Sequence, residues 1–497
     1  MSVYIFPHGK ATKDAVLAGL KELKPFENPM YKQLDDISTA RLFADLFQSV
    51  LRYNTTFKQF SVYDGTRWKK DAEGMTAEKL AKMFAISLVI MAAQSEQSKN
   101  TIDSANKLLQ RRYRTQMLQD CRDFYHVSAE MFDTQPNLLN CRNCVLDLET
   151  GDKLEHDSSL LLSKCINASY DSTASTATFE TFIEQIMQGD KDKALYLQMI
   201  MGYALTGTAE QEECYFMYGK STRNGKSTLL STIEHMMGDY AANIQPESLA
   251  MKDKKNGSAP TPDIARLKGI RFLHCGEPPK RMRLDAALLK GLTGGDTQTA
   301  RFLHEADFEF KPVFKLMLNT NYLPLVMDDT AFSSQRIKVI EFNRHFEESE
   351  QDIDLKRKLT TDENLSGILN WCYDGLAFYR GNNNRLTVPA SVTAATAEYR
   401  KNSDKMASFI EECLVQSEGG VVTGKRAYEV FVAWCRDNGY GCESKSNFFS
   451  ELKSKGLLSD TATINNNTVH NAIKGYLLDE TMLPDEGSPF KGYTGQS

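Results

Sequence analysis

The stretch Tyr218–Leu230, YGKSTRNGKSTLL, predicts the fold of the central part of the chain. The apolar run at 214–218 that leads into it is typical of a buried strand, and apolar residues at helical spacing follow it. Gly225, Lys226 and Ser227 therefore stand where a loop opens a helix. At such a place backbone N–H groups attract phosphate, a lysine neutralises its oxygens and a hydroxyl ligates magnesium. The sequence predicts a phosphate-binding loop.

The spacing of this loop departs from the usual pattern. GxxxxGK[ST] would place glycine at 220, where this chain has Lys220, and Gly219 is one residue too far away. We interpret the loop as one residue longer than usual, because the strand, the core and the helix are all in place. The alternative is a chance Gly-Lys-Ser on a surface turn. The expected nucleotide-binding residues are Gly219, Asn224, Gly225, Lys226, Ser227 and Thr228.

Three more polar residues follow or precede apolar strand candidates. Glu277 ends IRFLHCGE, where a carboxylate would hold magnesium or polarise an attacking water. Asn321 ends the strand in KLMLNTNYLP, where an amide would orient water against a terminal phosphate. Arg336 precedes the strand in FSSQRIKVIEF, the place of an arginine that reaches a neighbouring subunit. The alternatives are a solvated glutamate at a strand end and an ordinary surface arginine.

The remaining pattern predicts three domains and a tail. Apolar strands alternate with helices over 176–400, which is typical of an α/β domain with a parallel sheet. Residues 1–175 are predicted to be α+β: a helix over 40–53, a hairpin with its turn at Asp64-Gly65, and two strands around Thr150-Gly151. The Ser/Thr/Ala-rich stretch 170–179 is the expected linker. Three helices and a hairpin over 401–480 predict a winged helix, and 481–497 a flexible tail.

Composition excludes several classes of protein. The 497 residues carry 59 Lys plus Arg against 65 Asp plus Glu, a net charge of -6, which argues against a protein that coats nucleic acid non-specifically. No apolar run is long enough to span a membrane, so we expect no membrane partner. The N-terminus lacks the order of a signal peptide. With ten scattered cysteines and only one CxxC, at 141–144, we expect reduced thiols in the cytoplasm rather than a zinc site.

Taken together, the motifs resemble those of superfamily 3 helicases. YGKSTRNGKST, HCGEP, LKGLTGGDTQTARFLHE and LNTNYLP stand in the order of the Walker A, Walker B, B′ and C motifs, and QRIKVIEF follows. The resemblance is greatest to the poxvirus-type and phage/plasmid-type primase–helicases. YDGTRW and LLNCRNCVLDLETG resemble their N-terminal accessory domain, and 425–478 their C-terminal winged helix. The likeness covers about residues 35–480.

The resemblance implies an AAA+-like, hexameric ring that translocates single-stranded DNA through a central pore, with ATP and Mg²⁺ as cofactors. Single-stranded and forked DNA would be its partners. Lys226 and Ser227 would bind the phosphates and the metal. Glu277 would be the catalytic Walker B acid and a second metal ligand. Asn321 would be the sensor, and Arg336 the finger that acts in trans.

Two regions are expected to contact DNA. By the resemblance, the pore hairpin lies in TARFLHEADFEF (299–310), with Lys290, Arg301 and His304 facing the strand. In the winged helix, the lysines Lys445, Lys453 and Lys455 surround a helix that would enter a groove. The alternative is a winged helix that mediates protein contacts.

The expected function is an ATP-dependent replicative helicase of a phage or mobile element, in the host cytoplasm. An ATP-switched origin-binding initiator or loader uses the same site and stays open as an alternative. So does the helicase part of a primase–helicase; a separate primase or replication initiator would be a partner. We expect no priming by this chain alone, because Asp147 and Glu149 in LDLETG are better explained as part of a strand and turn.

Overall fold

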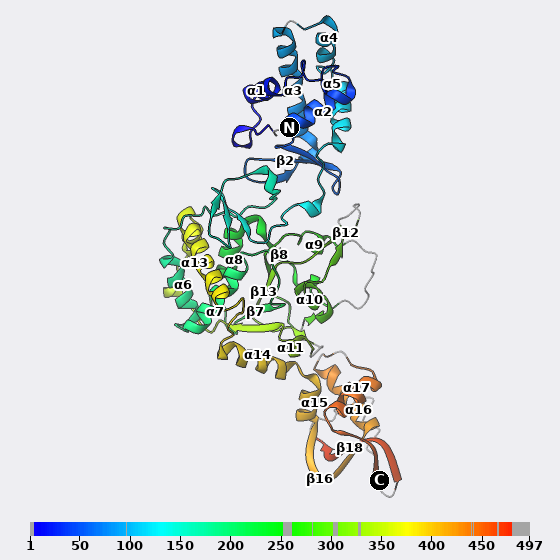
Figure 1. The fold of residues 1–497 in the computed structure, drawn as a ribbon. Coiled ribbons are helices and arrows are strands. Elements are labelled where there is room, and N and C mark those ends of the chain that lie inside the picture. The colour runs from blue at the N-terminus through cyan, green and yellow to red at the C-terminus, as the bar shows by residue number, and fades with distance from the viewer. Residues whose placement is uncertain are drawn as a thin grey trace. The chain divides into compact units, whose positions relative to one another are not determined.

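The computed structural model describes residues 4–95, 97–251, 261–280, 282–301, 307–326, 330–438, 440, 442–464 and 467–479 (Figure 1). The chain divides into two compact units. Residues 1–324 and 333–395 form the first, and residues 325–332 and 396–497 form the second. The predicted domain boundary near residue 175 falls inside the first unit, and the three-domain division stays a prediction.

A five-stranded parallel sheet forms the centre of the first unit. Its order is β15-β7-β13-β9-β8. The strands are β7 (Cys214–Tyr218), β8 (Ala241–Ile244), β9 (Phe272–Cys275), β13 (Lys315–Thr320) and β15 (Ile337–Glu341). All are almost wholly buried except the edge strand β8, which was not predicted. The α/β class with a parallel sheet is confirmed.

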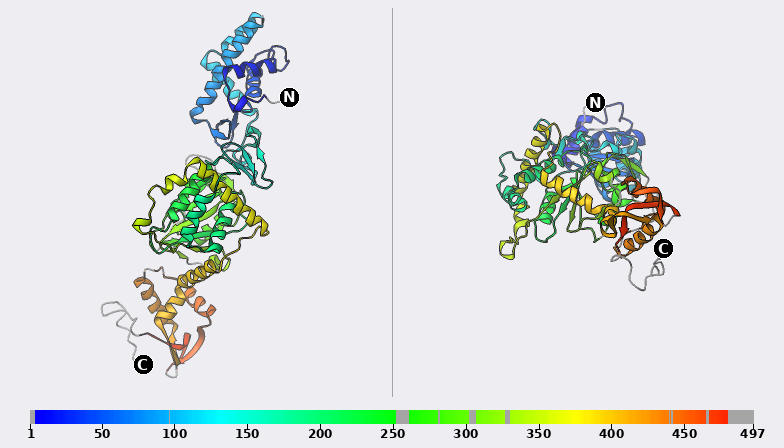
Figure 2. Two further views of the ribbon diagram at one scale, coloured as in Figure 1. Left: turned by 90° about the vertical axis from the view of Figure 1, so that its left-hand side faces the viewer. Right: turned by 90° about the horizontal axis from the view of Figure 1, so that it is seen from below.

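Helices cover both faces of this sheet, as the ribbon shows (Figures 1 and 2). On one side lie α6 (Ala177–Met187), α7 (Lys191–Tyr203), α8 (Lys226–Met237) and α13 (Asp362–Gly381), and on the other α9 (Pro262–Ala265) and α10 (Ala286–Thr293). Helices α7 and α13 approach closely through Gly202 and Gly375. A Cβ at Gly202 would lie 2.5 Å from the Cys372 carbonyl oxygen, so only glycine fits there. Helices α7 and α13 thus form a tightly packed layer on the same face of the sheet as α8.

The amino-terminal part of this unit is a helical cluster on a small sheet. Its helices are α1 (Lys13–Leu23), α2 (Asp36–Phe47), α3 (Met75–Gln94), α4 (Lys99–Lys107) and α5 (Arg111–Asp120). The strands β1 (Leu51–Asn54), β2 (Gln59–Tyr63) and β3 (Trp68–Lys70) form an antiparallel sheet, which confirms the hairpin. The helix predicted over 40–53 is confirmed as α2 up to Phe47, but its predicted end at residue 53 is wrong. It ends at Phe47 because Leu51 pairs with Val62 in the sheet.

The region 138–154 forms three short antiparallel strands where two were predicted. They are β4 (Leu138–Asn140), β5 (Val145–Asp147) and β6 (Lys153–Leu154). Asp147 accepts hydrogen bonds from the backbone N–H groups of Glu149 and Thr150, at 2.8 and 3.3 Å. Its carboxylate therefore caps the turn, as the strand-and-turn interpretation of LDLETG predicts.

The second unit contains the winged helix. Its helices are α15 (Lys405–Cys413), α16 (Gly424–Asp437) and α17 (Lys445–Ser454), and its antiparallel sheet has the order β16-β18-β17. Strands β17 (Leu458–Ile464) and β18 (Asn467–Leu478) are the predicted wing, and β16 (Leu414–Thr423) was not predicted. In its core, Phe409 contacts Phe431 edge to face, and Phe431 packs against Phe448 at a tilt. The winged-helix prediction is confirmed.

The remaining elements are short connections and one long helix. They are β10 (Arg283–Leu284), β11 (Gln298–Ala300), β12 (Phe308–Phe310), β14 (Leu325–Val326), α11 (Thr330–Ser333), α12 (Leu355–Leu359) and α14 (Ala390–Ser403). Within the described ranges, no helix is both long and apolar enough to cross a bilayer.

Candidate active site

The P-loop joins the end of β7 to the start of α8. The backbone N–H of Gly219 donates to the carbonyl of Thr320 at 3.2 Å, so the loop leaves the sheet beside β13. Gly225 is the residue before the helix and has φ +85°, in the left-handed region that glycine adopts without strain. Lys226 is the first helical residue. The N-terminus of α8 therefore opens at the carboxyl edge of the sheet, where an anion is favoured.

Lys226, Asn321 and Glu277 form a continuous hydrogen-bonded chain. The Lys226 Nζ donates to the Asn321 Oδ1 at 2.7 Å, and the Asn321 Nδ2 donates to the Glu277 Oε1. These residues come from segments that follow β7, β13 and β9, which lie side by side in the sheet. Because the strands are parallel, their carboxyl ends meet at one edge. The topology thus unites three of the four predicted catalytic residues.

The environment of Lys226 is unusual for a lysine. The residue is 3% exposed, and burial lowers the pKa of its amine to about 8, against the opposing attraction of Glu277. Its hydrogen bond goes to a neutral amide rather than to the carboxylate. A phosphate that approached this amine would supply the charge partner it lacks. The site is therefore electrostatically suited to an anion.

Ser227 has a partner that the sequence analysis missed. The Asn319 Nδ2 donates to the Ser227 Oγ at 3.2 Å. The Asn319 Oδ1 is buried and accepts no hydrogen bond from any described residue. Asn319 lies on β13 and Asn321 directly follows that strand. Their side chains bond to Ser227 and Lys226 of the P-loop, respectively. That spacing, NTN at a strand end, was the signal that could have identified it.

The P-loop itself is closely packed around Gly219. A Cβ at this position would clash with the Asn224 side chain and lie 2.9 Å from the Lys226 Nζ. The Asn224 Nδ2 donates to the Ser221 carbonyl at 2.6 Å and closes the loop. Thr228 lies in the first turn of α8. All six predicted nucleotide-binding residues are therefore gathered at this one place.

Arg336 lies elsewhere in this chain. Its carbonyl accepts from the backbone N–H of Cys214 at 2.7 Å, so it stands at the amino end of β7, a five-residue strand away from the P-loop. That separation is about 16 Å along the strand. Its guanidinium forms an ion pair with Glu212 at 2.6 Å and donates to the Thr293 hydroxyl at 3.0 Å. Within one chain the structure does not bring Arg336 to Lys226.

The predicted pore hairpin is an antiparallel pair. Strands β11 and β12 pair from Gln298 with Phe310 to Ala300 with Phe308. Arg301 follows β11 and lies 3.6 Å from the Asp307 carboxylate. Lys290 lies on α10, half-buried. His304 lies outside the described residues.

The three lysines predicted to contact DNA in the winged helix lie on or next to α17. The Lys445 Nζ is 5.7 Å from the centre of the Phe449 ring. Lys453 pairs with Asp460 at 3.2 Å, and Lys455 with Asp404 at 2.6 Å. A DNA phosphate would have to replace these two acidic partners.

The residues at the P-loop suit Mg²⁺. Magnesium takes few protein ligands, usually one or two oxygens together with waters and substrate phosphates. Ser227 and Glu277 are exposed beside Lys226 and supply one hydroxyl and one carboxylate. Elsewhere among the described residues, no group of three or more His, Cys, Asp or Glu side chains gathers as a metal site would require.

Two family models match the chain. The model described as "D5 N terminal like" matches residues 40–188, and the one described as "Poxvirus D5 protein-like" matches residues 401–477. These segments lie on either side of the P-loop region. They are the segments for which the sequence analysis noted a resemblance to an accessory domain and a winged helix.

Curated relatives come from viruses. "Putative helicase L207/L206" of Acanthamoeba polyphaga mimivirus is 28% identical over 410 residues, 79% of this chain and 40% of that protein. "Putative helicase 022R" of Frog virus 3 is 30% identical over 43% of this chain and 23% of its own length. "Putative primase C962R" of African swine fever virus is 24% identical over 58% of this chain and 32% of its own. The chain spans less than half of each relative.

A solved structure has the same overall fold. The apo structure of the C-terminal region of NrS-1 covers 89% of this chain and 99% of its own, with a TM-score of 0.50 and 12% identity.

Proposed function

Because the chain is related to the viral D5-type primase–helicases, we propose that it is a replicative DNA helicase driven by ATP hydrolysis. ATP and Mg²⁺ are the proposed cofactors, and single-stranded or forked DNA is the proposed substrate. Six copies of the chain are proposed to form a ring that translocates on one DNA strand. The relatives named as helicases support the reaction class.

One observation carries the proposal: the hydrogen-bonded chain from Lys226 through Asn321 to Glu277. A P-loop lysine alone would bind phosphate without cleaving it. Here an amide and a carboxylate are held at the same edge by the two neighbouring strands, so groups that can orient a water stand next to the phosphate site.

Each side chain has a distinct task in this proposal. The α8 N–H groups and Lys226 bind the phosphates, and Lys226 exchanges its bond to Asn321 for a phosphate oxygen. Asn321 and Glu277 orient the attacking water, with Glu277 exposed and able to accept its proton. Ser227, with Asn319 behind it, is placed to ligate Mg²⁺, which when bound neutralises charge on the phosphates.

Arg336 fits a role in trans rather than in cis. It lies at the sheet edge opposite the P-loop of its own chain and is fixed there by Glu212 and Thr293. In a ring this edge would face the nucleotide of the next subunit. The Arg336 side chain is 15% exposed, so it would leave Glu212 to reach a phosphate.

A strand-displacement assay on forked DNA tests the proposal and separates it from the initiator alternative. The wild-type protein should displace a labelled strand with ATP, and the tail requirement reports polarity. Glu277→Gln should abolish displacement while it still binds ATP. Glu348→Gln, an exposed carboxylate outside the site, is the matched control and should displace normally. ATP turnover without displacement would favour the initiator, and no turnover would refute the proposal.

A further inference from the structure

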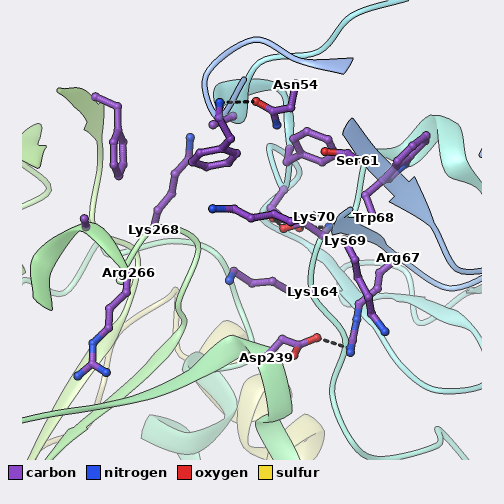
Figure 3. A pocket seen from close by; sticks show the side chains of 17 residues that line it. Asn54, Ser61, Arg67, Trp68, Lys69, Lys70, Lys164, Asp239, Arg266 and Lys268 are labelled. Carbon is purple, nitrogen blue, oxygen red and sulfur yellow. Dashed lines mark hydrogen bonds and ion pairs between the residues drawn. The ribbon is translucent and has the colours of Figure 1, made fainter. Parts of the chain in front are cut away.

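A second cavity lies away from the P-loop, between the amino-terminal sheet and the segments around α9 (Figure 3). Its volume is about 520 Å³, within the range of small-ligand sites. Four aromatic residues and six Lys or Arg line it, against two carboxylates. The ATP hydrolysis proposed above does not involve this cavity.

The two carboxylates of the wall are already bound. Asp239 forms an ion pair with Arg67. Asp133 accepts from the backbone N–H and from the hydroxyl of Ser163. Lys69 is likewise engaged, by Asp64 at 2.6 Å. The two carboxylates thus face six Lys or Arg side chains, so the wall carries an excess of positive charge.

Three amines point into the same space. Figure 3 shows Lys70, Lys164 and Lys268 converging from different segments, while the Arg266 guanidinium points away. The Lys268 Nζ is buried and has no hydrogen-bond partner among the described residues. Burial lowers the pKa of Lys164 and of Lys268, although carboxylates nearby oppose the shift. A buried amine without a hydrogen-bonded partner, such as that of Lys268, is costly, and a ligand anion would relieve that cost.

Aromatic faces stand beside these amines. The Lys70 Nζ lies 3.8 Å from the centre of the Phe57 ring, and the Lys268 Nζ lies 5.9 Å from that of Phe308. Amines next to aromatic faces bind the two halves of a nucleotide, because cations contact the phosphate and rings stack on the base. Phe308 belongs to β12, in the hairpin predicted to contact DNA.

We propose that this cavity binds a nucleotide, with its phosphate between Lys164 and Lys268 and its base against Phe57 or Phe308. The nucleotide is either free or one unit of a single strand that passes the hairpin. The site is independent of the P-loop and does not rest on the helicase activity.

The test removes the two amines together. Lys164→Met/Lys268→Met is compared with Lys79→Met/Lys356→Met, which removes two exposed lysines and the same charge. Binding is followed by fluorescence anisotropy of labelled oligothymidylate. Labelled ATP is used in parallel, with all proteins carrying Lys226→Ala so that the P-loop does not mask the second site. The cavity variant should bind one probe at least tenfold more weakly, and the control should not.

The two probes distinguish the source of the nucleotide. Weaker binding of the oligonucleotide alone indicates a single strand. The slope of log affinity against log salt should then become shallower by about 0.7, because the proposal places one phosphate between the two amines. Weaker binding of ATP alone indicates a free nucleotide. Equal binding of both probes by both variants overturns the proposal. In a protein that keeps Lys226, the cavity variant should retain its DNA-independent ATP turnover. Loss of binding in the cavity therefore does not depend on whether the P-loop hydrolyses ATP, and the two proposals can fail separately.

Photocrosslinking of the unmodified protein keeps the proposal testable even if the cavity variant unfolds. A bromodeoxyuridine-substituted strand or an azido-ATP should crosslink to peptides that contain Phe57 or Phe308. Crosslinks confined to other peptides would overturn the assignment.

Discussion

Nucleotide binding at the P-loop should weaken as the pH rises through about 8. The perturbation is deprotonation of Lys226, whose pKa burial lowers to about 8. Phosphate binding favours the charged amine, so affinity is full below this pKa and falls above it. With a pKa of about 8, the charged fraction is about 0.9 at pH 7 and about 0.1 at pH 9. The affinity should therefore fall about tenfold, or about 1.4 kcal/mol, over that interval.

The assay is titration calorimetry with ADP at pH 7, 8 and 9, without magnesium so that metal binding does not enter. Glu277→Gln removes the charge that opposes the shift, so its half-loss of affinity should move to lower pH. Glu348→Gln should keep the wild-type profile. An affinity that changes less than twofold between pH 7 and 9 would show that protonation of Lys226 does not control nucleotide binding, as would identical profiles for the wild type and Glu277→Gln.

Three other predictions concern close packing and subunit contacts. Gly219→Ala should lower ATP turnover about a hundredfold, because the new methyl group displaces the Lys226 amine by up to about 1 Å. Gly202→Ala should lower the melting temperature by several degrees, because overpacking of about 1–3 kcal/mol against α13 outweighs the gain in helix propensity. Arg336→Ala should lose turnover alone but regain part of it when mixed with Lys226→Ala, if the arginine acts in trans.

Each prediction has a matched control or a contradicting outcome. A Cβ at Gly276 or Gly381 meets no atom within 4 Å, so alanine at either position should be harmless. Normal turnover in Gly219→Ala would contradict the close contact between Gly219 and the Lys226 amine, and an unchanged melting temperature in Gly202→Ala would contradict the close contact between α7 and α13. Mixed Arg336→Ala and Lys226→Ala proteins that stay inactive would contradict the trans role.

The sequence predicted the parts of the fold that local patterns encode. The apolar runs before Gly219, Glu277 and Asn321 are strands of the parallel sheet, and the Asp64-Gly65 turn is a hairpin. The expected helix failed at Leu51 because apolar residues at helical spacing continue into a strand, and only pairing with Val62 decides between the two.

What the sequence could not predict depends on long-range contacts. Lys315 begins the buried strand β13, and Arg271 directly precedes the buried strand β9; a charged residue at such a position argues against burial. The Lys315 Nζ is nevertheless buried because it donates to the Thr206 and Thr208 carbonyls, at 2.8 and 2.7 Å, over a hundred residues away. Arg271 likewise donates to carbonyls from distant segments, those of residues 205 and 138. Such partners leave no periodic signal.

The two proposed binding sites also depend on contacts between residues far apart in the sequence. Sequence order suggested that Lys226, Asn321 and Glu277 act together, but only the strand order places β13 between the other two strands. The role of Asn319 was not predicted because its contact with Ser227 joins residues that are 92 positions apart in the sequence. The second cavity combines Lys70, Lys164 and Lys268 from three distant segments, and no motif links them.

The most direct test of the central claim is ATP turnover by the wild-type protein and by Lys226→Met, each with and without single-stranded DNA. We expect DNA-stimulated hydrolysis by the wild type and at least a hundredfold loss in the variant, with an unchanged melting temperature. Equal turnover by the two proteins would contradict the assignment of this edge of the sheet as the site of ATP hydrolysis.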